Sequence, residues 1–593
     1  MPHAVPKGMG LQALILCGPG SSFPTFTASP DENPKALLPI ANRPMVWYPL
    51  DFCYRAGITD VTLICPPSAA EAIKTALKTN PFLTSLSAPT VVAPTELYHT
   101  TGTAAILRLP EVRAVVTADF VVLPCDLVCE LGGEKLLQAW MVRAASLVDI
   151  LGSDEPESSF LSVASAAAAS STAAAAGSGS ALHSGGLGVW YDTRTGIPNV
   201  KSEEKDFVAT VPLAGSTTAA PVPAKSTASL LPRLERVVTA MPTDSLNDLM
   251  EEKGDYPVRH GLLRRHRRVR MRTTHRDAHI YVFPQWVMDF VQANEHMDSI
   301  GEDVLGWWAR AQWQPTLPKK LRLHKVLQTY GDQLHDAGGS SPPATDSGDV
   351  PPSVDGTAAA DLSAAADAVA AAEDITLAAA AAATAAAAAG AAAETTAAEQ
   401  QVPPFLAYVH PSAATAPLIR RVDTSQLLLT VSLQLAKLPS VEEVAAGTVD
   451  SSTASPFAHT KKVAYPEGVK SRTTITRQDS LVADNVTVEE KVSIKECVVG
   501  ANCQIHEGAK LHQCLLMEGV VVGKGCRLTR CILGKRSDIG AGSVLTDCEV
   551  QENLLVEPKT EEKENNFMSS KGLEATAEEM DEALEDDENA IAE

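Results

Sequence analysis

Residues 498–514 read VVGANCQIHEGAKLHQC, residues 515–531 read LLMEGVVVGKGCRLTRC, and residues 532–548 read ILGKRSDIGAGSVLTDC. The three segments align with a 17-residue period, with apolar residues at the second, eighth and fourteenth positions of each. The offsets of six, six and five residues between these positions predict three short strands per period, which form one three-sided coil. Because a single coil cannot bury its apolar side alone, the coils must stack. The pattern therefore predicts a parallel β-helix of about four coils.

One outer face of this β-helix is expected to be apolar. Four cysteines recur at the same period, at Cys497, Cys514, Cys531 and Cys548. The two-residue alternation of a strand places these cysteines inside the coil and Val498, Leu515 and Ile532 on its outer surface. An apolar stripe on one face of a rigid prism is expected to be covered. The sequence therefore predicts an interface at these three residues, either with another part of this chain or with another subunit.

The composition narrows the class of protein. The 593 residues carry 72 acidic and 49 basic side chains, and the resulting net charge of −23 makes RNA an unexpected partner. The 11 cysteines show no paired CxxC spacing typical of zinc sites, which favours a reducing compartment. We expect neither a signal peptide nor a membrane span. These features predict a protein of the cytosol that contacts no membrane.

The order of the segments predicts two domains. Short β-branched runs alternate with helical stretches in residues 11–150, which is typical of an α/β domain with helices on both faces of its sheet. Strand-like runs resume after an Ala/Ser-rich segment, and again after an alanine-rich segment to which we assign no role. The predicted bounds are a first domain at 1–440 with insertions at about 153–184 and 335–402, a linker at 441–478, the β-helix at 479–558, and a disordered acidic tail at 559–593.

Several residues of the first domain suit a phosphate-binding site. A turn that contains Gly18 and Gly20 follows the first predicted strand, and free backbone N–H groups in such a turn can bind phosphates. Lys35 follows in the segment NPKALLPI, and Asp126 ends the strand segment LPCD. These four residues are the predicted nucleotide site. The alternative is that Asp126 caps a strand and Lys35 is a surface charge.

These motifs resemble the sugar-nucleotide pyrophosphorylase superfamily, whose first loop reads GGxGTR and precedes PKxLLP. The segment GTAAI at residues 102–106 resembles the base-binding motif of that superfamily, and Asp126 resembles its metal-binding aspartate. The resemblance implies a nucleotidyltransferase-like (Rossmann-like) mixed-sheet domain followed by a C-terminal left-handed parallel β-helix. It also implies a second metal ligand at Asp423, in the segment RVDT, so that Asp126 and Asp423 would hold Mg²⁺ and a nucleotide.

Three positions of the first loop depart from that superfamily. Ser22 stands where the superfamily has an arginine that stabilises charge on the attacked phosphate. Cys17 replaces a glycine, and Pro19 removes a backbone donor. We therefore predict no catalytic residues and a vestigial nucleotide site.

Other segments resemble one branch of this superfamily, the gamma-subunit family of translation initiation factor 2B. They are RDAHIYVF at residues 276–283, SIGED at 299–303, and the first β-helix repeats. The resemblance implies a noncatalytic regulatory subunit of the guanine-nucleotide exchange factor for translation initiation factor 2. Its partners would be the catalytic epsilon subunit, the other subunits of the complex, and initiation factor 2. Epsilon subunits add a helical catalytic domain, for which we expect no room after Pro558.

Two hypotheses in which the protein is an enzyme remain open. The first is an active sugar-nucleotide pyrophosphorylase, such as a mannose-1-phosphate guanylyltransferase. The second is an acyltransferase that uses a histidine of the β-helix, although His506 and His512 are expected to face solvent.

The run RRHRRVRMR at residues 264–272 is a further feature of the sequence. Its alternation predicts a strand with Arg268, Arg270 and Arg272 on one face. Such a strand is either an edge protected by charge or a contact for an acidic partner surface or bound RNA.

Overall fold

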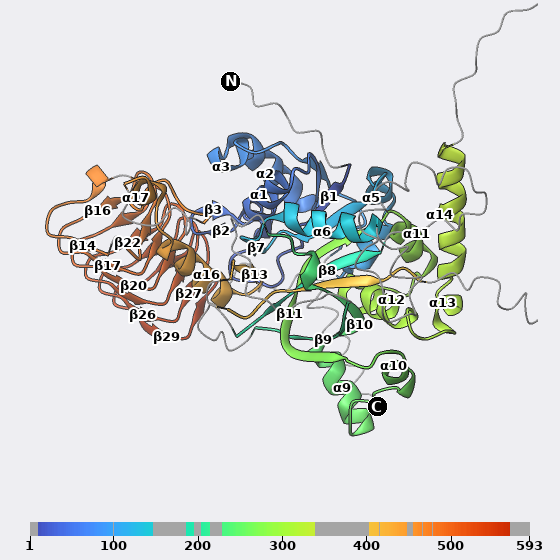
Figure 1. The fold of residues 1–593 in the computed structure, drawn as a ribbon. Helices are drawn as coiled ribbons and strands as arrows, with labels where there is room; N and C mark the ends of the chain where they lie inside the picture. Colours follow the sequence, from blue (N-terminus) through green and yellow to red (C-terminus); the bar gives the residue numbers. More distant parts are fainter. Residues whose placement is uncertain are drawn as a thin grey trace, which may run out of the picture.

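The computed structural model describes residues 10–98, 100–145, 185–194, 203–213, 228–338, 402–413, 416–446, 455–464, 466–476 and 478–569. The chain forms an α/β domain and a β-helix that lie side by side (Figure 1). The predicted insertions, apart from residues 335–338 and 402, lie outside the described residues, as do residues 570–593 of the predicted tail. In the part of the chain that is described, no helix combines the length and the apolar character needed to cross a bilayer.

A mixed sheet forms the centre of the first domain, as predicted. Its nine strands, counted within the described residues, run in the order β5-β4-β1-β6-β11-β8-β12-β10-β9. The strands are β1 (Gln12–Leu16), β4 (Asp60–Ile64), β5 (Thr90–Val92), β6 (Phe120–Pro124), β8 (Gly186–Asp192), β9 (Asp206–Pro212), β10 (Leu234–Pro242), β11 (Arg270–Phe283) and β12 (Phe405–Val409). Strands β5, β4, β1 and β6 are parallel, and β11 joins them in the antiparallel direction. The carboxyl ends of β1 and β6 therefore lie at one edge, next to β11.

Helices cover both faces of this sheet. Alternate residues of β1 point to opposite faces: Ile15 lies in one hydrophobic core with α1 (Trp47–Ala56) and α6 (Gly133–Ala145), and Leu14 lies in the other with α11 (Trp286–Ala293) and α12 (Leu305–Ala311). The other α-helices are α2 (Pro67–Thr79), α3 (Pro81–Thr84), α4 (Thr103–Arg108), α5 (Pro110–Val115), α9 (Thr243–Lys253), α10 (His260–Arg265), α13 (Leu317–Lys320), α14 (Leu323–Gly338), α16 (Ser425–Lys437) and α17 (Val441–Ala445). Shorter helical turns are η1 (Lys35–Leu37), η3 (Leu231–Arg233), η4 (Ile300–Val304) and η6 (Pro466–Gly468).

Two small antiparallel pairs complete the first domain. They are β2 (Pro39–Ile40) with β3 (Arg43–Pro44), and β7 (Leu127–Cys129) with β13 (Ile419–Arg421). The second pair places Arg421 opposite Leu127, directly beside the end of β6.

The second domain is a parallel β-helix with three sheets. Over the described residues, the sheets hold six, six and five strands, in the orders β14-β17-β20-β23-β26-β29, β15-β18-β21-β24-β27-β30 and β16-β19-β22-β25-β28. The strands are β14 (Thr474–Ile475), β15 (Leu481–Val482), β16 (Thr487–Val488), β17 (Ser493–Lys495), β18 (Val498–Val499), β19 (Gln504–Ile505), β20 (Lys510–His512), β21 (Leu515–Leu516), β22 (Val521–Val522), β23 (Arg527–Thr529), β24 (Ile532–Leu533), β25 (Asp538–Ile539), β26 (Val544–Thr546), β27 (Glu549–Val550), β28 (Leu555–Val556), β29 (Glu561–Lys563) and β30 (Asn566–Phe567). In-register partners are separated by one period of the sequence repeat, as in Leu515 with Ile532.

The β-helix is longer at both ends than the predicted bounds 479–558 and the predicted four coils. At its start, Val463 pairs with Val482 and Thr474 pairs with Ser493, so the first coil is longer than the period that the sequence repeats. At its end, β29 and β30 lie in the segment predicted as a disordered tail. Glu562 there takes the register position of Leu545 and is exposed, because it lies in the last described coil.

The interior of the coils is packed with cysteines and apolar residues. The four cysteines of the predicted ladder are fully buried: Cys497, Cys514, Cys531 and Cys548. The coils stack closely at the turns, since a Cβ atom built on Gly523 would lie 2.6 Å from the carbonyl oxygen of Ile539 in the next coil. A residue without a side chain is therefore required at this turn.

The apolar stripe of the β-helix lies against the first domain of the same chain. Val498 and Leu515 are 0% exposed and Ile532 is 3% exposed, and all three belong to a core that includes residues of α1 and α16. Helix α16 lies between the two domains, against β18 and β21 (Figure 1). The side chain of Asn42 donates a hydrogen bond of 2.9 Å to the carbonyl of Val499. The sequence predicted that either another part of this chain or another subunit covers the stripe. In the structure, the first domain of the same chain covers it.

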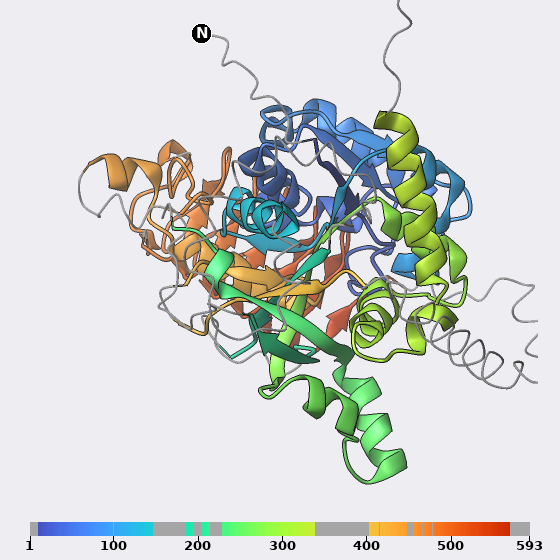
Figure 2. The ribbon, with the colours of Figure 1, turned by 45° about the vertical axis from the view of Figure 1, so that its right-hand side comes forward.

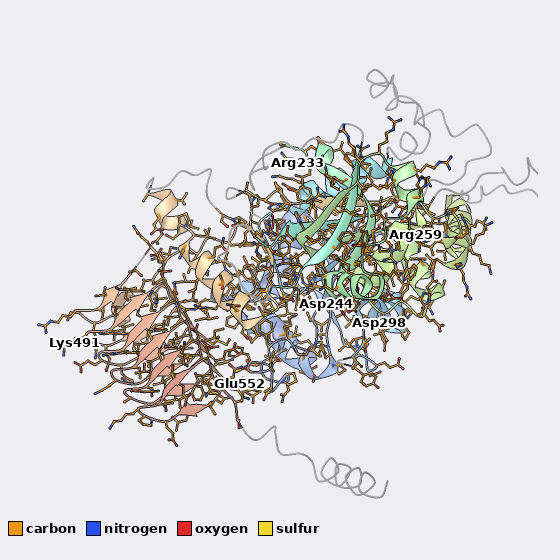
Figure 3. The ribbon with its side chains drawn as sticks, turned by 90° about the horizontal axis from the view of Figure 1, so that it is seen from below. Arg233, Asp244, Arg259, Asp298, Lys491 and Glu552 are labelled. Atoms are coloured by element: carbon orange, nitrogen blue, oxygen red, sulfur yellow. The ribbon has the colours of Figure 1, made fainter. Side chains whose placement is uncertain are left out.

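Most outward positions on the other two faces of the β-helix are polar, although Leu555 is an exposed apolar residue there. Figure 3 shows Lys491 extending outward, whereas Glu552 lies on the side near the first domain. His512 is exposed, and His506 is half-buried beside Glu489, with 3.3 Å between Nδ1 and the carboxylate. The prediction of solvent exposure is thus right for His512 and only partly right for His506.

The arginine run begins before β11 and continues into it. Arg268 is exposed, but Arg270 and Arg272 both form ion pairs with Glu235 of β10, at 3.1 Å for Arg272. The charge on this strand face is therefore partly neutralised within the sheet. The preceding helices α9 and α10, in green, project from the sheet at the bottom of Figure 2.

Candidate functional site

A cavity of about 200 Å³ opens at the carboxyl ends of β1 and β6. Its polar lining includes Lys35, Asp126, His279 and Arg421. Its apolar lining includes Leu16, Ile64, Leu97, Ile106, Val122 and Ile300. The structure thus brings Lys35 and Asp126 together at the edge of the sheet where the sequence placed them.

The first loop contributes one of its two predicted glycines to the cavity. Gly18 lines the cavity together with Pro19. Gly20 is buried and adopts a φ of 92°, and the hydroxyl of Thr27 donates a hydrogen bond of 2.8 Å to its carbonyl. Gly20 therefore shapes the turn and is not part of the cavity lining. Ser22 is exposed and is also absent from the residues that line the cavity.

Lys35 and Asp126 form a buried ion pair. The Lys35 Nζ lies 2.7 Å from Asp126 Oδ2, and the two side chains are 12% and 2% exposed. Burial by itself would raise the pKa of Asp126, but the charges of Lys35 and Arg421 outweigh it and lower the pKa to about 2. Asp126 is therefore a carboxylate at neutral pH. Lys35 is not the surface charge that the alternative reading of the sequence supposed.

Arg421 lies between the two carboxylates that were predicted to bind a metal. Its Nε is 3.7 Å from Asp126 Oδ1, and its Nη2 is 3.7 Å from Asp423 Oδ2. Its Nη1 donates a hydrogen bond of 3.1 Å to Nε2 of His279. Burial, followed by the charge of Arg421, lowers the pKa of His279 well below its ordinary value, so this imidazole is neutral. Arg421 thus joins Asp126, Asp423 and His279 in one cluster.

A second arginine engages both oxygens of Asp423. Arg276, whose side chain is 2% exposed, donates a hydrogen bond of 3.1 Å to Asp423 Oδ1 and another to Oδ2. It also pairs with Glu204 at 3.1 Å. Both oxygens of Asp423 therefore accept hydrogen bonds from Arg276, whose charge offsets that of the carboxylate.

The predicted metal site does not fit this arrangement. Mg²⁺ needs carboxylate oxygens within about 2.1 Å, whereas the guanidinium of Arg421 occupies the space between Asp126 and Asp423. Within the described residues, no group of three or more histidine, cysteine or acidic side chains is arranged to hold a metal. The metal hypothesis for Asp126 and Asp423 considered the carboxylates without the arginines of β11 and β13, and the contacts of these arginines argue against it.

His279 and Tyr281 are site residues that the sequence analysis missed. They lie in β11 where its register with β8 shifts between Asp277 and Tyr281. His279 adopts a φ of 52°, which is unusual for a residue with a side chain, and both side chains line the cavity. A bulge of this kind leaves no clear signal in a single sequence.

Asp277, at the base of this bulge, predicts a measurable pH dependence. Burial, followed by the charge of Asp206, raises its pKa to about 7. Tyr281 donates a hydrogen bond of 2.6 Å to its Oδ2, and the backbone N–H of His279 donates one of 2.9 Å to Oδ1. Because the folded pKa lies above the unfolded value of about 3.9, the stabilisation from this group is complete below about pH 4 and is lost as pH rises through about 7.

Asp277→Asn is therefore expected to flatten the dependence of the unfolding free energy on pH between pH 5 and 8. Asp277 contributes a slope of up to about 1.4 kcal/mol per pH unit in the unmodified protein. Urea titrations at four pH values would measure the difference, with Asp255→Asn at an exposed site as the control. Equal slopes for Asp277→Asn and the unmodified protein would contradict this role.

Comparisons with known proteins agree with the two domains. A family model described as nucleotidyl transferase matches residues 27–165. A second model, the EIF2B subunit epsilon LbH (left-handed β-helix) domain, matches residues 464–561. A curated relative is "Translation initiation factor eIF2B subunit gamma" from Schizosaccharomyces pombe, which is 26% identical over 330 residues. The chain is similar to an eIF2B gamma subunit. The match covers 56% of this chain and 58% of the relative.

These matches confirm the predicted fold class. The chain has a nucleotidyltransferase-like mixed-sheet domain followed by a left-handed β-helix. The second model begins at residue 464, close to the first paired residue of the coils, Val463.

Proposed function

We propose that this chain is a noncatalytic regulatory and structural subunit of the guanine-nucleotide exchange factor for translation initiation factor 2. It pairs with the catalytic epsilon subunit in the cytosol and promotes GDP release. The similarity to an eIF2B gamma subunit, together with the epsilon-type β-helix model, supports this assignment.

The main structural support for a noncatalytic role is the position of Arg421 between Asp126 and Asp423. Phosphoryl and nucleotidyl transfer depend on positioned cations that neutralise charge as it develops on the phosphates. In this chain the guanidinium stands between the two carboxylates and is itself paired with them. In the first loop, Ser22 is a neutral, exposed side chain and Pro19 has no backbone donor.

The proposed role can be tested by measuring GDP release from initiation factor 2. We expect the isolated chain to leave the release rate unchanged. We expect epsilon in complex with this chain to release GDP faster than epsilon alone at equal concentration. A release rate that does not change when this chain is added to epsilon would contradict the proposal.

An active sugar-nucleotide pyrophosphorylase is the second candidate, because Lys35 and Asp126 still line a cavity at the expected edge of the sheet. The test is incubation with Mg²⁺, nucleoside triphosphates and sugar phosphates, including GTP with mannose 1-phosphate. We expect no release of pyrophosphate above background. Release that Asp126→Ala abolishes would favour the enzyme instead.

A further inference from the structure

Arg421 holds a position that sets the charge of the cavity. Its guanidinium approaches both Asp126 and Asp423 at 3.7 Å and forms a shorter contact of 3.1 Å with His279. The side chain is 15% exposed and lies on β13, which the antiparallel pairing with β7 fixes next to the end of β6. Arg421 is therefore held by the sheet framework and not by a surface loop.

Two buried polar atoms of this cluster have no hydrogen-bond partner in the described part of the chain. They are the Nε of Arg421 and the Oδ1 of Asp126, which face each other at 3.7 Å. This distance is an ion pair but is too long for a hydrogen bond. A buried N–H group without an acceptor is costly, and the opposite charge of Asp126 offsets that cost here.

The charged groups that line the cavity carry one excess positive charge. Lys35 and Arg421 are cations, Asp126 is a carboxylate, and His279 is neutral. The remaining walls are largely apolar. An anionic group attached to an apolar or ring-shaped body suits such a cavity, and phosphate esters have this composition.

We propose that the guanidinium of Arg421 is a built-in cation in the place of a divalent metal, and that the cavity takes up a phosphate-bearing ligand without such a metal. Mg²⁺ between Asp126 and Asp423 would have to displace Arg421, which also donates a hydrogen bond to His279. This inference concerns the cavity alone. It can fail or hold independently of the role in the exchange-factor complex.

The metal half of the proposal is tested by manganese binding to the full chain, measured by the electron paramagnetic resonance signal of free Mn²⁺. We expect no saturable site in the unmodified protein or in Arg421→Lys, which keeps the positive charge. Arg421→Ala frees the space between the carboxylates, and we expect it to gain a saturable Mn²⁺ site that the unmodified protein lacks. Adding Asp126→Asn to that variant should remove the gained site.

A saturable Mn²⁺ site in the unmodified protein would overturn this half, and so would a folded Arg421→Ala protein without any gain. Circular dichroism melting of each variant establishes that it is folded. If Arg421→Ala does not fold, the unmodified protein and Arg421→Lys still decide the question, because metal binding by either one contradicts the proposal.

The ligand half is tested by calorimetric titration with inorganic pyrophosphate, in EDTA and in Mg²⁺. We expect saturable binding in EDTA and a dissociation constant at least tenfold higher for Arg421→Ala. The exposed Arg268→Ala variant is the matched control and should bind as the unmodified protein does. Binding that is absent in EDTA, whether or not Mg²⁺ restores it, would overturn this half of the proposal.

Discussion

Replacing Leu515 with glutamate is expected to detach the β-helix from the first domain while both domains stay folded. Leu515 is fully buried on the outer side of β21, where α16 covers it. The surrounding core is built from apolar side chains, so the burial of a carboxylate at this position costs several kcal/mol. Because the side chain points away from the interior of the coils, the ladder hydrogen bonds of the β-helix are unaffected.

Calorimetry would measure this effect directly. We expect one cooperative unfolding transition in the unmodified protein and two separate transitions in Leu515→Glu. Limited proteolysis should cut the variant faster between residues 441 and 464. The matched control is Val521→Glu, a half-buried outward position on β22 with Gln504 and Asp538 as its register partners. A Leu515→Glu protein that melts and resists proteolysis like the unmodified one would show that the stripe does not hold the domains together.

Asp126→Asn is expected to have the second large effect, a loss of about 3 to 5 kcal/mol of unfolding free energy at pH 7. The substitution leaves two buried cations, Lys35 and Arg421, without the carboxylate that both approach. Breaking a buried ion pair from one side is costly because the remaining charge stays out of water. Urea unfolding would measure the loss, and Asp255→Asn at an exposed site should change the stability by less than about 0.5 kcal/mol.

The sign of the pH dependence gives a second check on this ion pair. Because the folded pKa of Asp126 is lowered to about 2, its stabilisation is present above the unfolded pKa of about 3.9 and is lost as pH falls toward 2. The difference between the unmodified protein and Asp126→Asn should therefore shrink between pH 5 and pH 2. A difference that stays constant over this range would mean that Asp126 does not act as a paired carboxylate.

The repeats were predictable because each coil meets the same packing requirement at the same interval along the chain. The prediction failed where that requirement changes. The first coil is longer than the repeat, since Thr474 pairs with Ser493, and Glu562 in the last described coil takes an interior register position without being buried. The sequence also identified the stripe at Leu515, but it could not decide the partner, since α16 comes into contact only through the tertiary fold.

The candidate site was predictable only in part, because some of its contacts join residues that are distant in the sequence. Lys35 and Asp126 could be placed because both follow recognisable strand ends and motifs. The partners of Asp423 could not be placed, because Arg276 is far away along the chain and reaches Asp423 from β11. Carboxylates look alike in a sequence whether a metal or an arginine neutralises them, so only the fold could reveal the arginines beside Asp126 and Asp423.

We propose that this chain works as a subunit and not as an enzyme on its own. The most direct test of this proposal is to purify the tagged chain at its native level and to measure the mass and composition of what is recovered. We predict a complex that contains an epsilon subunit of the exchange factor. A solitary monomer of 62.6 kDa would contradict the account.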